Sequence, residues 1–277
     1  MGGAEPSGPS ADTAQPVRSL GPERRQERIA EIVLARGTVS AQDLAETFAV
    51  SVMTIHRDLD ELQRRGVLRK SRGAATAQPS GTFESNVEYR AKANLEAKQA
   101  IAQHACRHVE SGMSVLLDDS TTALQMVPHL AALAPLTVAT NYLTAMIELA
   151  KHRDLNLVGL GGQYDVQHNS FLGFMCSETV RSMRFDVSFV STSAVMNGHA
   201  FHHEDRIVSV KREMVAVASR CYLLLDHSKL RRTALHRLVP LRAFEAVIVD
   251  ADTPAEQRAE LEEHDVRVEV AGRAEAG

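Results

Sequence analysis

Residues 49–59 read AVSVMTIHRDL, and this stretch decides the fold of the first part of the chain. Upstream of it, Ser40 and Asp43 form a helix-start pattern, because two side-chain oxygens three residues apart can satisfy free backbone N–H groups. A short connection then leads to Ser51, whose hydroxyl is placed to cap a second helix that continues to about residue 65. Two short helices joined this tightly predict a helix-turn-helix.

The second of these helices has two distinct faces. Ile55, Leu59 and Leu62 fall together on a helical wheel, which indicates that this face packs inward. Met53 and Arg57 point the opposite way. A DNA major groove admits one helix, and an arginine there can bind guanine through two hydrogen bonds, worth roughly 1–3 kcal/mol of discrimination. The exposed face therefore suits base reading.

A basic segment follows this helix. Residues 67–73 suit a short hairpin or wing, and the cations between Leu62 and Gly73 have no acidic residue among them. Such a run attracts phosphates by counterion release, whatever the base sequence. Because amphipathic helix pairs and solvated basic runs are also common elsewhere, spacing alone leaves both interpretations open. The residues predicted to contact DNA are Ser40, Ser51, Met53, Thr54, His56, Arg57, Arg64, Arg69, Lys70 and Arg72.

Several motifs here carry a family resemblance. They are Gly37-Thr38-Val39-Ser40, Asp43-Leu44-Ala45, Phe48-Ala49-Val50-Ser51, Thr54-Ile55-His56-Arg57-Asp58-Leu59, Leu62 and Gly66. Together they resemble the N-terminal domain of the DeoR family of bacterial transcriptional regulators. Two positions depart from the family pattern: His56 replaces a first arginine, and Ser71-Arg72-Gly73-Ala74 replaces His-Gly-Gly-Ala. The resemblance implies a double-stranded DNA operator as partner.

Composition and charge bound the remainder. A chain of 277 residues suggests two domains, at roughly 100–200 residues each. The net charge of −4 argues against nucleic-acid binding if taken alone, but residues 22–75 hold ten Lys/Arg against eight Asp/Glu, or +2. Three widely spaced cysteines fit reduced thiols in a cytosol. No secretory segment and no apolar run near 18 residues is visible, so we expect a cytoplasmic protein without a membrane span.

The chain divides by composition into four parts. Residues 1–20 are rich in Gly, Ala, Pro and Ser without periodicity, which predicts a disordered tail. Residues 21–76 are expected to form the winged helix-turn-helix, and 77–89 a linker. Residues 90–272 are expected to form an effector-sensing domain.

In this last part, short apolar runs alternate with helical patterns. We expect strands at residues 113–117, 136–139, 155–160, 186–190, 221–225, 246–249 and 266–270, and helices at 92–109, from about 122, and at 143–150. Buried strands alternating with helices predict an α/β fold with a mainly parallel sheet covered on both faces. Ligands bind such sheets at the carboxyl ends of the strands.

Polar residues and glycines follow several of these strands. Thr121 and Thr122 open a predicted helix, so hydroxyls, free N–H groups and the helix dipole would together suit a phosphate-sized anion. A hydroxyl before a helix is usually only a cap, and a Gly-Gly pair only a turn, but the pattern recurs at four strand ends. The predicted effector-binding residues are Asp118, Ser120, Thr121, Thr122, Thr140, Asn141, Gly161, Gly162, Lys211, Asp226 and Lys229.

Most of residues 84–250 also carry a resemblance. Its motifs are Arg90, Lys98, Leu117-Asp118, Thr121-Thr122, Thr140-Asn141, Gly161-Gly162, Gly173, Asp186, Lys211 and Asp226-His227-Ser228-Lys229. They are similar to the effector domain of the DeoR family. The resemblance implies a fold akin to ribose-5-phosphate isomerase and the CoA-transferases, with a phosphorylated sugar or sugar-like metabolite as effector. By position, Thr121 and Thr122 would hold the phosphate, Asp118 a sugar hydroxyl, and Lys211 and Lys229 would close the pocket.

The resulting hypothesis is a DNA-binding transcriptional regulator, a repressor of carbohydrate genes that acts as a homo-oligomer (dimer or tetramer). We predict no catalytic residue, cofactor or metal. One alternative is a sugar-phosphate isomerase-like enzyme that uses Asp118 and Lys229 as an acid–base pair. Another is a DNA-binding scaffold with a vestigial pocket.

Two further groups of side chains have alternative interpretations. His199, His202, His203 and Glu204 are possible metal ligands, but they show no fixed periodicity and no distant partner. Cys106 near His104 and His108 could be an activated thiol, although a cysteine in an alanine-rich helix is more often a small buried hydrophobe.

Overall fold

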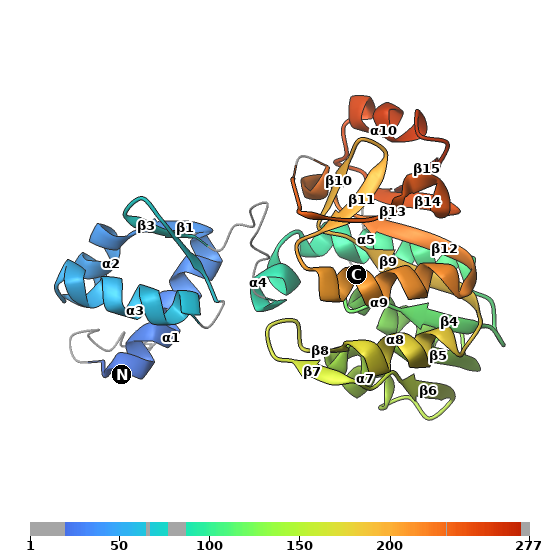
Figure 1. Ribbon diagram of the computed structural model, residues 1–277, viewed down its shortest axis with the longest axis horizontal. Helices are drawn as coiled ribbons and strands as arrows, with labels where there is room; N and C mark the ends of the chain where they lie inside the picture. The colour runs from blue at the N-terminus through green and yellow to red at the C-terminus, as the bar shows by residue number, and fades with distance from the viewer. Residues whose placement is uncertain (1–19, 65–66, 77–86, 231, 273–277) are drawn as a thin grey trace, which may run out of the picture. The chain divides into compact units, whose positions relative to one another are not determined.

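The computed structural model describes residues 20–64, 67–76, 87–230 and 232–272. The chain divides into two compact units, Met1–Ala77 and Gln78–Gly277 (Figure 1). The tail expected over residues 1–20, apart from Leu20, lies outside the described residues. So do residues 77–86 of the expected linker, and the described chain resumes with α4 (Val87–Lys92).

The first unit is a winged helix-turn-helix, as the sequence predicted. Its helices are α1 (Pro22–Arg36), α2 (Ala41–Phe48) and α3 (Val52–Arg64). Its strands β1 (Thr38–Ser40), β2 (Arg69–Ser71) and β3 (Ala74–Thr76) form an antiparallel sheet in the order β1-β3-β2.

Side-chain caps fix the two helices of the motif. The Ser40 hydroxyl accepts the N–H of Asp43 at 3.0 Å, and the Ser51 hydroxyl accepts that of Thr54 at 3.1 Å. Between the helices, Ala49 adopts the left-handed conformation with φ 51°. The face predicted to pack inward is buried in a core that comprises Ile29, Val33, Leu44, Phe48, Ile55, Leu59, Leu62 and Leu68.

A buried ion pair also holds α3 against α1. The Arg25 Nε lies 2.6 Å from Asp58 Oδ2, and the Gln26 amide donates to Asp58 Oδ1 at 3.1 Å. Asp58 follows Arg57 directly, so this link fixes the rotation of α3 and therefore the side that Arg57 faces. The sequence did not predict this contact.

The second unit is built on a seven-stranded parallel sheet. All seven predicted strands belong to it, in the order β15-β14-β12-β9-β4-β5-β6. Their bounds are β4 (Ser114–Leu117), β5 (Leu136–Thr140), β6 (Leu155–Gly159), β9 (Phe185–Ser191), β12 (Ala218–Leu225), β14 (Ala246–Asp250) and β15 (Arg267–Ala271).

Helices cover both faces of this sheet (Figure 1). One face carries α5 (Leu95–Ala105), α6 (Val127–Ala131) and α7 (Leu143–Leu149), and the other carries α8 (Phe174–Arg181), α9 (Asp205–Ala216) and α10 (Ala255–Glu262). Alternate residues of β4 serve the two cores: Val115 and Leu117 face the first set, and Leu116 faces the second.

Some elements differ from the sequence prediction. The helix expected from about residue 122 is a single 3-10 turn, η2 (Ala123–Met126), followed by the short α6. Pro128, in the first turn of α6, has no N–H to donate and so interrupts a continuous helix. Two small sheets were not predicted: the hairpin of β7 (Gln163–Asp165) and β8 (Ser170–Leu172), and the group β10 (Ala194–Met196), β11 (His199–His202) and β13 (His236–Pro240).

The strand order positions the site. From β4 the chain moves outward to β5 and β6, then returns to β9 on the other side of β4. The order therefore reverses between β4 and β9, and the crevice outside the carboxyl ends of two such strands is where open α/β sheets bind ligands. Within the described residues, every helix is too short or too polar to cross a membrane.

Candidate functional site

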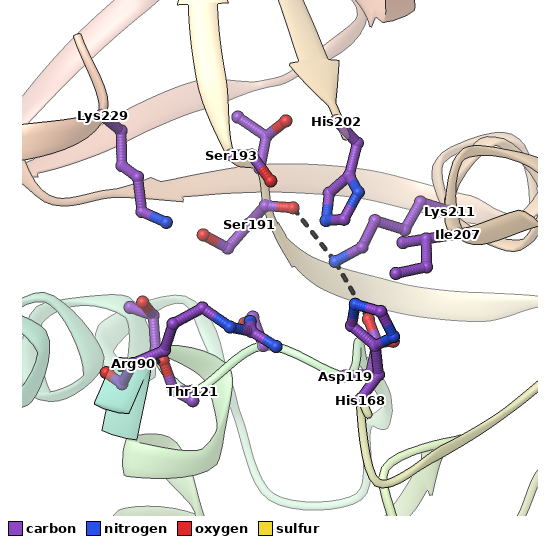
Figure 2. Close-up of a pocket in the computed structure, with 13 residues that line it drawn as sticks. Arg90, Asp119, Thr121, His168, Ser191, Ser193, His202, Ile207, Lys211 and Lys229 are labelled. Atoms are coloured by element: carbon purple, nitrogen blue, oxygen red, sulfur yellow. Dashed lines mark hydrogen bonds and ion pairs between the residues drawn. The ribbon is translucent and has the colours of Figure 1, made fainter. Parts of the chain in front are cut away.

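A polar pocket lies at this reversal point, beyond the carboxyl ends of β4 and β9. It encloses about 360 Å³ of empty space, part of it open to solvent. In Figure 2, Arg90, Thr121 and Lys229 lie towards one end of it, and Asp119, His168 and Lys211 towards the other. The lining residues are Arg90, Asp119, Ser120, Thr121, Thr122, His168, Ser191, Thr192, Ser193, His202, Ile207, Lys211 and Lys229.

Lys211 on α9 is buried between two carboxylates. Its ammonium contacts Asp118 and lies 3.1 Å from Asp119 Oδ1, and it also donates to the Ser191 carbonyl at 3.1 Å. Burial alone would lower the Lys211 pKa, but the two carboxylates outweigh it and raise the pKa above its ordinary value. Burial likewise acts against ionisation of Asp119, yet Lys211, His168 and His202 hold its pKa well below the usual range. Lys211 and Asp119 are therefore held in their charged forms.

Asp118 is enclosed behind the pocket and does not line it. Its two oxygens accept the N–H groups of Ser120 at 3.0 Å and Ser191 at 2.7 Å, in addition to Lys211. These bonds tie the end of β4 to the end of β9. Asp118 thus holds the ends of the two strands together, and Asp119 is the carboxylate that lines the pocket.

The cationic end of the pocket has the features of an anion site. Among the described residues, the N–H groups of Thr121 and Thr122 have no hydrogen-bond acceptor. The Thr121 hydroxyl lies 3.4 Å from the Arg90 carbonyl, so the backbone of Arg90 is next to these N–H groups. Lys229 lies across the pocket from them (Figure 2). Free N–H groups with an arginine and a lysine bind phosphate or carboxylate.

Two further charged groups support this end. Asp226 caps the turn that carries Lys229 by accepting the Ser228 N–H at 3.1 Å, and Asn94 donates to Asp226 at 3.0 Å. Lys98 is almost fully buried and donates to the carbonyls of Arg90 and Ala93. Burial, followed by the cations Lys229 and Arg90, lowers the Lys98 pKa to about 7 against the opposing effect of Asp226.

The opposite end of the pocket is lined by histidines. His168, in the connection between β7 and β8, donates from Nδ1 to the Asp165 carboxylate at 3.0 Å, and its Nε2 lies 3.4 Å from Glu204 Oε1. His202 approaches from the end of β11. Carboxylate and imidazole groups at this end suit hydroxyls of a ligand better than a second anion.

The predicted effector residues fall into three groups in the structure. Ser120, Thr121, Thr122, Lys211 and Lys229 line the pocket together. Asp118 and Asp226 lie behind it and hold lining residues in place. The remaining four do not line it: Thr140, Asn141, Gly161 and Gly162.

Three of those four residues make local contacts in the neighbouring chain instead, and a Cβ at Gly161 would meet open space. Thr140 accepts the Tyr142 N–H at 3.1 Å, and Asn141 donates to the Phe171 carbonyl at 3.0 Å. A Cβ at Gly162 would lie 2.6 Å from the Leu172 carbonyl oxygen, so only glycine lets β8 approach there. The contacts of Asn141 and Gly162 therefore position the β7–β8 hairpin that carries His168.

Sequence reasoning missed several lining residues. They are Arg90, Asp119, His168, Ser191, Thr192, Ser193, His202 and Ile207. The end of β9 lies at the same edge of the sheet as the four strand ends that were considered, and including it would have identified Ser191, Thr192 and Ser193. His168 and His202 lie in small strands and hairpins that have no strong sequence pattern.

The rival interpretations are not supported by these contacts. Asp118 contacts Lys211 instead of Lys229, so the proposed acid–base pair is not formed. His199 bonds to the Asn197 carbonyl and His202 lines the pocket, and the groups of described side chains close enough to share a metal lie elsewhere. Burial raises the Cys106 pKa to about 12, as expected of a small buried hydrophobe and not of an activated thiol.

The first unit presents a second candidate surface, on α3 and the wing. Met53 is 63% exposed and Arg57 is exposed beside it, as the helical wheel predicted. The hydroxyls of Ser51 and Thr54 share a hydrogen bond of 2.9 Å, and the Ser40 hydroxyl already accepts the Asp43 N–H that caps α2. His56 is half-buried.

The wing is a tight hairpin with a cation at its tip. Ser71 pairs with Ala74, and the two loop residues Arg72 and Gly73 both have positive φ, at 37° and 82°. This is the turn type whose twist matches a two-residue hairpin. Arg72 is exposed there, whereas Lys70 lies 2.5 Å from Asp60.

The remaining predicted cations differ in their surroundings. Arg64 pairs with Glu61 at 2.6 Å, and Arg69 is half-buried on β2. Among the described residues, neither Arg57 nor Arg72 forms an ion pair. These two therefore offer the least encumbered charges to a duplex.

Comparisons with known proteins identify the family of each unit. A family model described as "DeoR-like helix-turn-helix domain" matches residues 25–80, and one described as "DeoR C terminal sensor domain" matches residues 93–251. The "L-fucose operon activator" of Haemophilus influenzae is 29% identical over 243 residues, covering 87% of this chain and 97% of that protein. The "Glycerol-3-phosphate regulon repressor" of Escherichia coli strain K12 is 26% identical over 248 residues, covering 89% and 98%. Among solved structures, ribose 5-phosphate isomerase A from Methanocaldococcus jannaschii matches with a TM-score of 0.37 and 18% identity, over 50% of this chain and 55% of that one.

Proposed function

Because the chain belongs to the DeoR family of transcriptional regulators, we propose that it represses carbohydrate genes and is released from DNA by a phosphorylated sugar or polyol. Residues 21–76 read the operator and residues 90–272 sense the effector. The family consists of regulators, so an isomerase activity is not favoured.

One observation carries the choice of effector class: the pocket has unequal ends. Arg90, Lys229 and the free N–H groups at Thr121 and Thr122 gather at one end, while Asp119 and the histidines lie at the other. A ligand with a phosphate at one end and hydroxyls at the other satisfies both. Because Lys211 is already neutralised by two aspartates, the phosphate belongs with Arg90 and Lys229.

Effector binding to the second unit has to change DNA binding by the first unit. A single winged helix makes too few contacts for firm specificity, so we expect a dimer or tetramer that binds paired half-sites. The effector then has to prefer one arrangement of the DNA-reading units over another, and such coupling is typically about 1–3 kcal/mol.

The test separates DNA binding from effector sensing. The full-length chain is titrated with DNA fragments from upstream of carbohydrate genes, with and without a panel of sugar and polyol phosphates. We expect Lys229→Ala to bind the fragment as the parent does but to require far more effector for release. The matched control is Lys151→Ala, which also replaces a lysine of the second unit. Lys151 is exposed in the turn after α7 and pairs with Glu148 on that helix.

Two results would refute the proposal. One is that no fragment is retained at low ionic strength. The other is turnover of a sugar phosphate that Lys229→Ala abolishes, which would make the chain an enzyme.

A further inference from the structure

A second group of polar side chains lies away from the effector pocket, where α5 meets the edge strand β15. His104 comes from the last turn of α5, His108 from the 3-10 turn η1 (Cys106–His108), and Glu269 from β15. The Nε2 atoms of both histidines converge on one oxygen of Glu269, at 2.9 and 2.8 Å. Each of the three side chains is between 15% and 19% exposed.

Neighbouring residues hold these groups in fixed orientations. The His108 ring stacks on the buried ring of Tyr222, with centroids 4.2 Å apart. Arg267 binds the other oxygen of Glu269 at 2.8 Å, which leaves Oε2 directed at the two imidazoles. Burial would raise the Glu269 pKa, but His108, His104 and Arg267 lower it below its ordinary value, so the carboxylate is charged.

From this arrangement we infer that His104, His108 and Glu269 form a binding site for a divalent transition metal, with Zn²⁺ as the best fit. Two imidazole nitrogens and one carboxylate oxygen are a recurrent protein ligand set for zinc, with water in the fourth position. All three ligand atoms lie within 4.8 Å of one another. Tetrahedral bonds near 2.0–2.1 Å separate ligand atoms by about 3.3 Å, so the nitrogen–oxygen contacts have to lengthen by only about 0.5 Å.

The exchange is chemically simple. In the structure, each imidazole donates its Nε2 proton to Glu269, and metal binding requires each ring to present a lone pair from Nε2 instead. A neutral imidazole does this by carrying its proton on Nδ1, and a protonated one by releasing a proton to solvent. Oxygen and imidazole donors without any thiolate suit Zn²⁺ and do not favour Cu(I).

A second grouping is a poorer candidate. His227 lies 2.7 Å from Asp250 and near Asp252, but Asp250 already accepts the His227 backbone N–H at 2.7 Å and the Thr253 hydroxyl at 3.3 Å. Those two bonds go to Oδ1 and leave Oδ2 to the His227 ring, but Asp252 is exposed and the group offers only one imidazole. Imidazole suits Zn²⁺, whereas carboxylates suit Mg²⁺ and Ca²⁺, so this is the poorer zinc site. His227 therefore serves as a matched control.

The consequence of metal binding is a clamp between α5 and β15. Asn94 precedes helix α5 and Lys98 lies in its first turn, and both support the cationic end of the effector pocket. The last turn of the same helix carries His104 of this cluster. A metal at its far end therefore limits movement of the helix on which that end of the pocket rests. The inference stands independently of the proposed effector.

The test measures Zn²⁺ binding to the untagged full-length chain by isothermal titration calorimetry, with Co²⁺ as a spectroscopic substitute. We expect one ion per chain, a rise in melting temperature, and the visible absorption bands of four- or five-coordinate Co²⁺. His104→Gln and Glu269→Gln should each weaken Zn²⁺ binding by more than about tenfold, since even an outer-shell partner is worth that much. A glutamine at position 104 can still donate to Glu269, so this variant keeps the local structure while removing a good ligand.

Other outcomes would overturn the inference. It fails if no saturable binding occurs, or if both variants bind Zn²⁺ like the parent while His227→Gln does not. Circular dichroism of each variant checks its fold. Should a variant unfold, the parent's cobalt spectrum decides, because only weak octahedral bands would mean a loosely held surface ion.

Discussion

At the scale of single residues, the DNA-reading unit separates two kinds of cation. Arg57 projects from α3 beside Met53, where a helix in the major groove meets base edges, and Arg72 occupies the tip of the wing. Arg64 and Lys70 are instead paired with Glu61 and Asp60. We therefore expect base reading and phosphate attraction to come from different parts of the unit.

This division makes a prediction about binding. Arg57→Ala should cost about 1–3 kcal/mol on a specific site and little on random DNA, because a base contact is lost. Arg72→Ala should weaken all sequences alike and reduce the salt slope by about one. Fluorescence anisotropy at several salt concentrations measures both effects.

The control is Arg28→Ala on α1, an exposed arginine that already pairs with Glu31. It makes the same change in charge within the same unit. If Arg57→Ala and Arg72→Ala behave alike, or like Arg28→Ala, the two roles are not separate.

At the scale of elements, the turn between α2 and α3 has a strained residue. Ala49 adopts φ 51°, a conformation that costs an L-residue roughly 1–2 kcal/mol and glycine nothing. Replacing Ala49 by glycine would remove this cost. Glycine also loses more backbone entropy on folding than alanine does, and this loss offsets part of the gain in stability.

Ala49→Gly should therefore stabilise the first unit by about 0.5–1 kcal/mol, measured by urea unfolding followed by circular dichroism. Ala30→Gly, in the middle of α1, is the matched comparison and should destabilise by about 1 kcal/mol. Equal effects of the two substitutions would contradict the conformational argument.

The elements also show what sequence patterns can predict. The central strands of the main sheet were predictable because they are buried apolar runs of limited length, and the edge strands β6 and β15 because apolar residues recur along them. The caps at Ser40 and Ser51 were predictable because they are local. The β7–β8 hairpin and the β10–β11–β13 sheet are held by contacts between distant segments, so short patterns do not mark them.

The same distinction applies to the candidate sites. Thr121, Thr122 and Lys229 follow strands directly and were predicted to line the pocket, whereas His168 reaches it from a hairpin. The bond from Asp58 to Arg25 and the meeting of Glu269 with His108 join residues 33 and 161 positions apart. No local pattern encodes such a pairing.

At the scale of the whole molecule, each compact unit has its own hydrophobic core. We expect two separate unfolding transitions in calorimetry of the full chain. Operator duplex should raise the midpoint of the first unit alone, and a sugar phosphate that of the second. At 100 times its dissociation constant, either ligand adds about 2.7 kcal/mol to the unit that binds it.

The assignment of transitions needs a reference. The fragment 78–277, which keeps α4 and Arg90, should reproduce the second transition and its response to the sugar phosphate. A single cooperative transition in the full chain, moved equally by both ligands, would mean that the two units do not unfold independently.

The trio of Lys211, Asp118 and Asp119 also constrains how this sequence can diverge. Removing Lys211 leaves two buried carboxylates side by side without their cation, and breaking a buried ion pair in this way typically costs about 3–5 kcal/mol. A neutral replacement at position 211 is tolerable only alongside compensating changes at 118 and 119. Descendants of this chain should therefore keep all three residues or exchange them in concert.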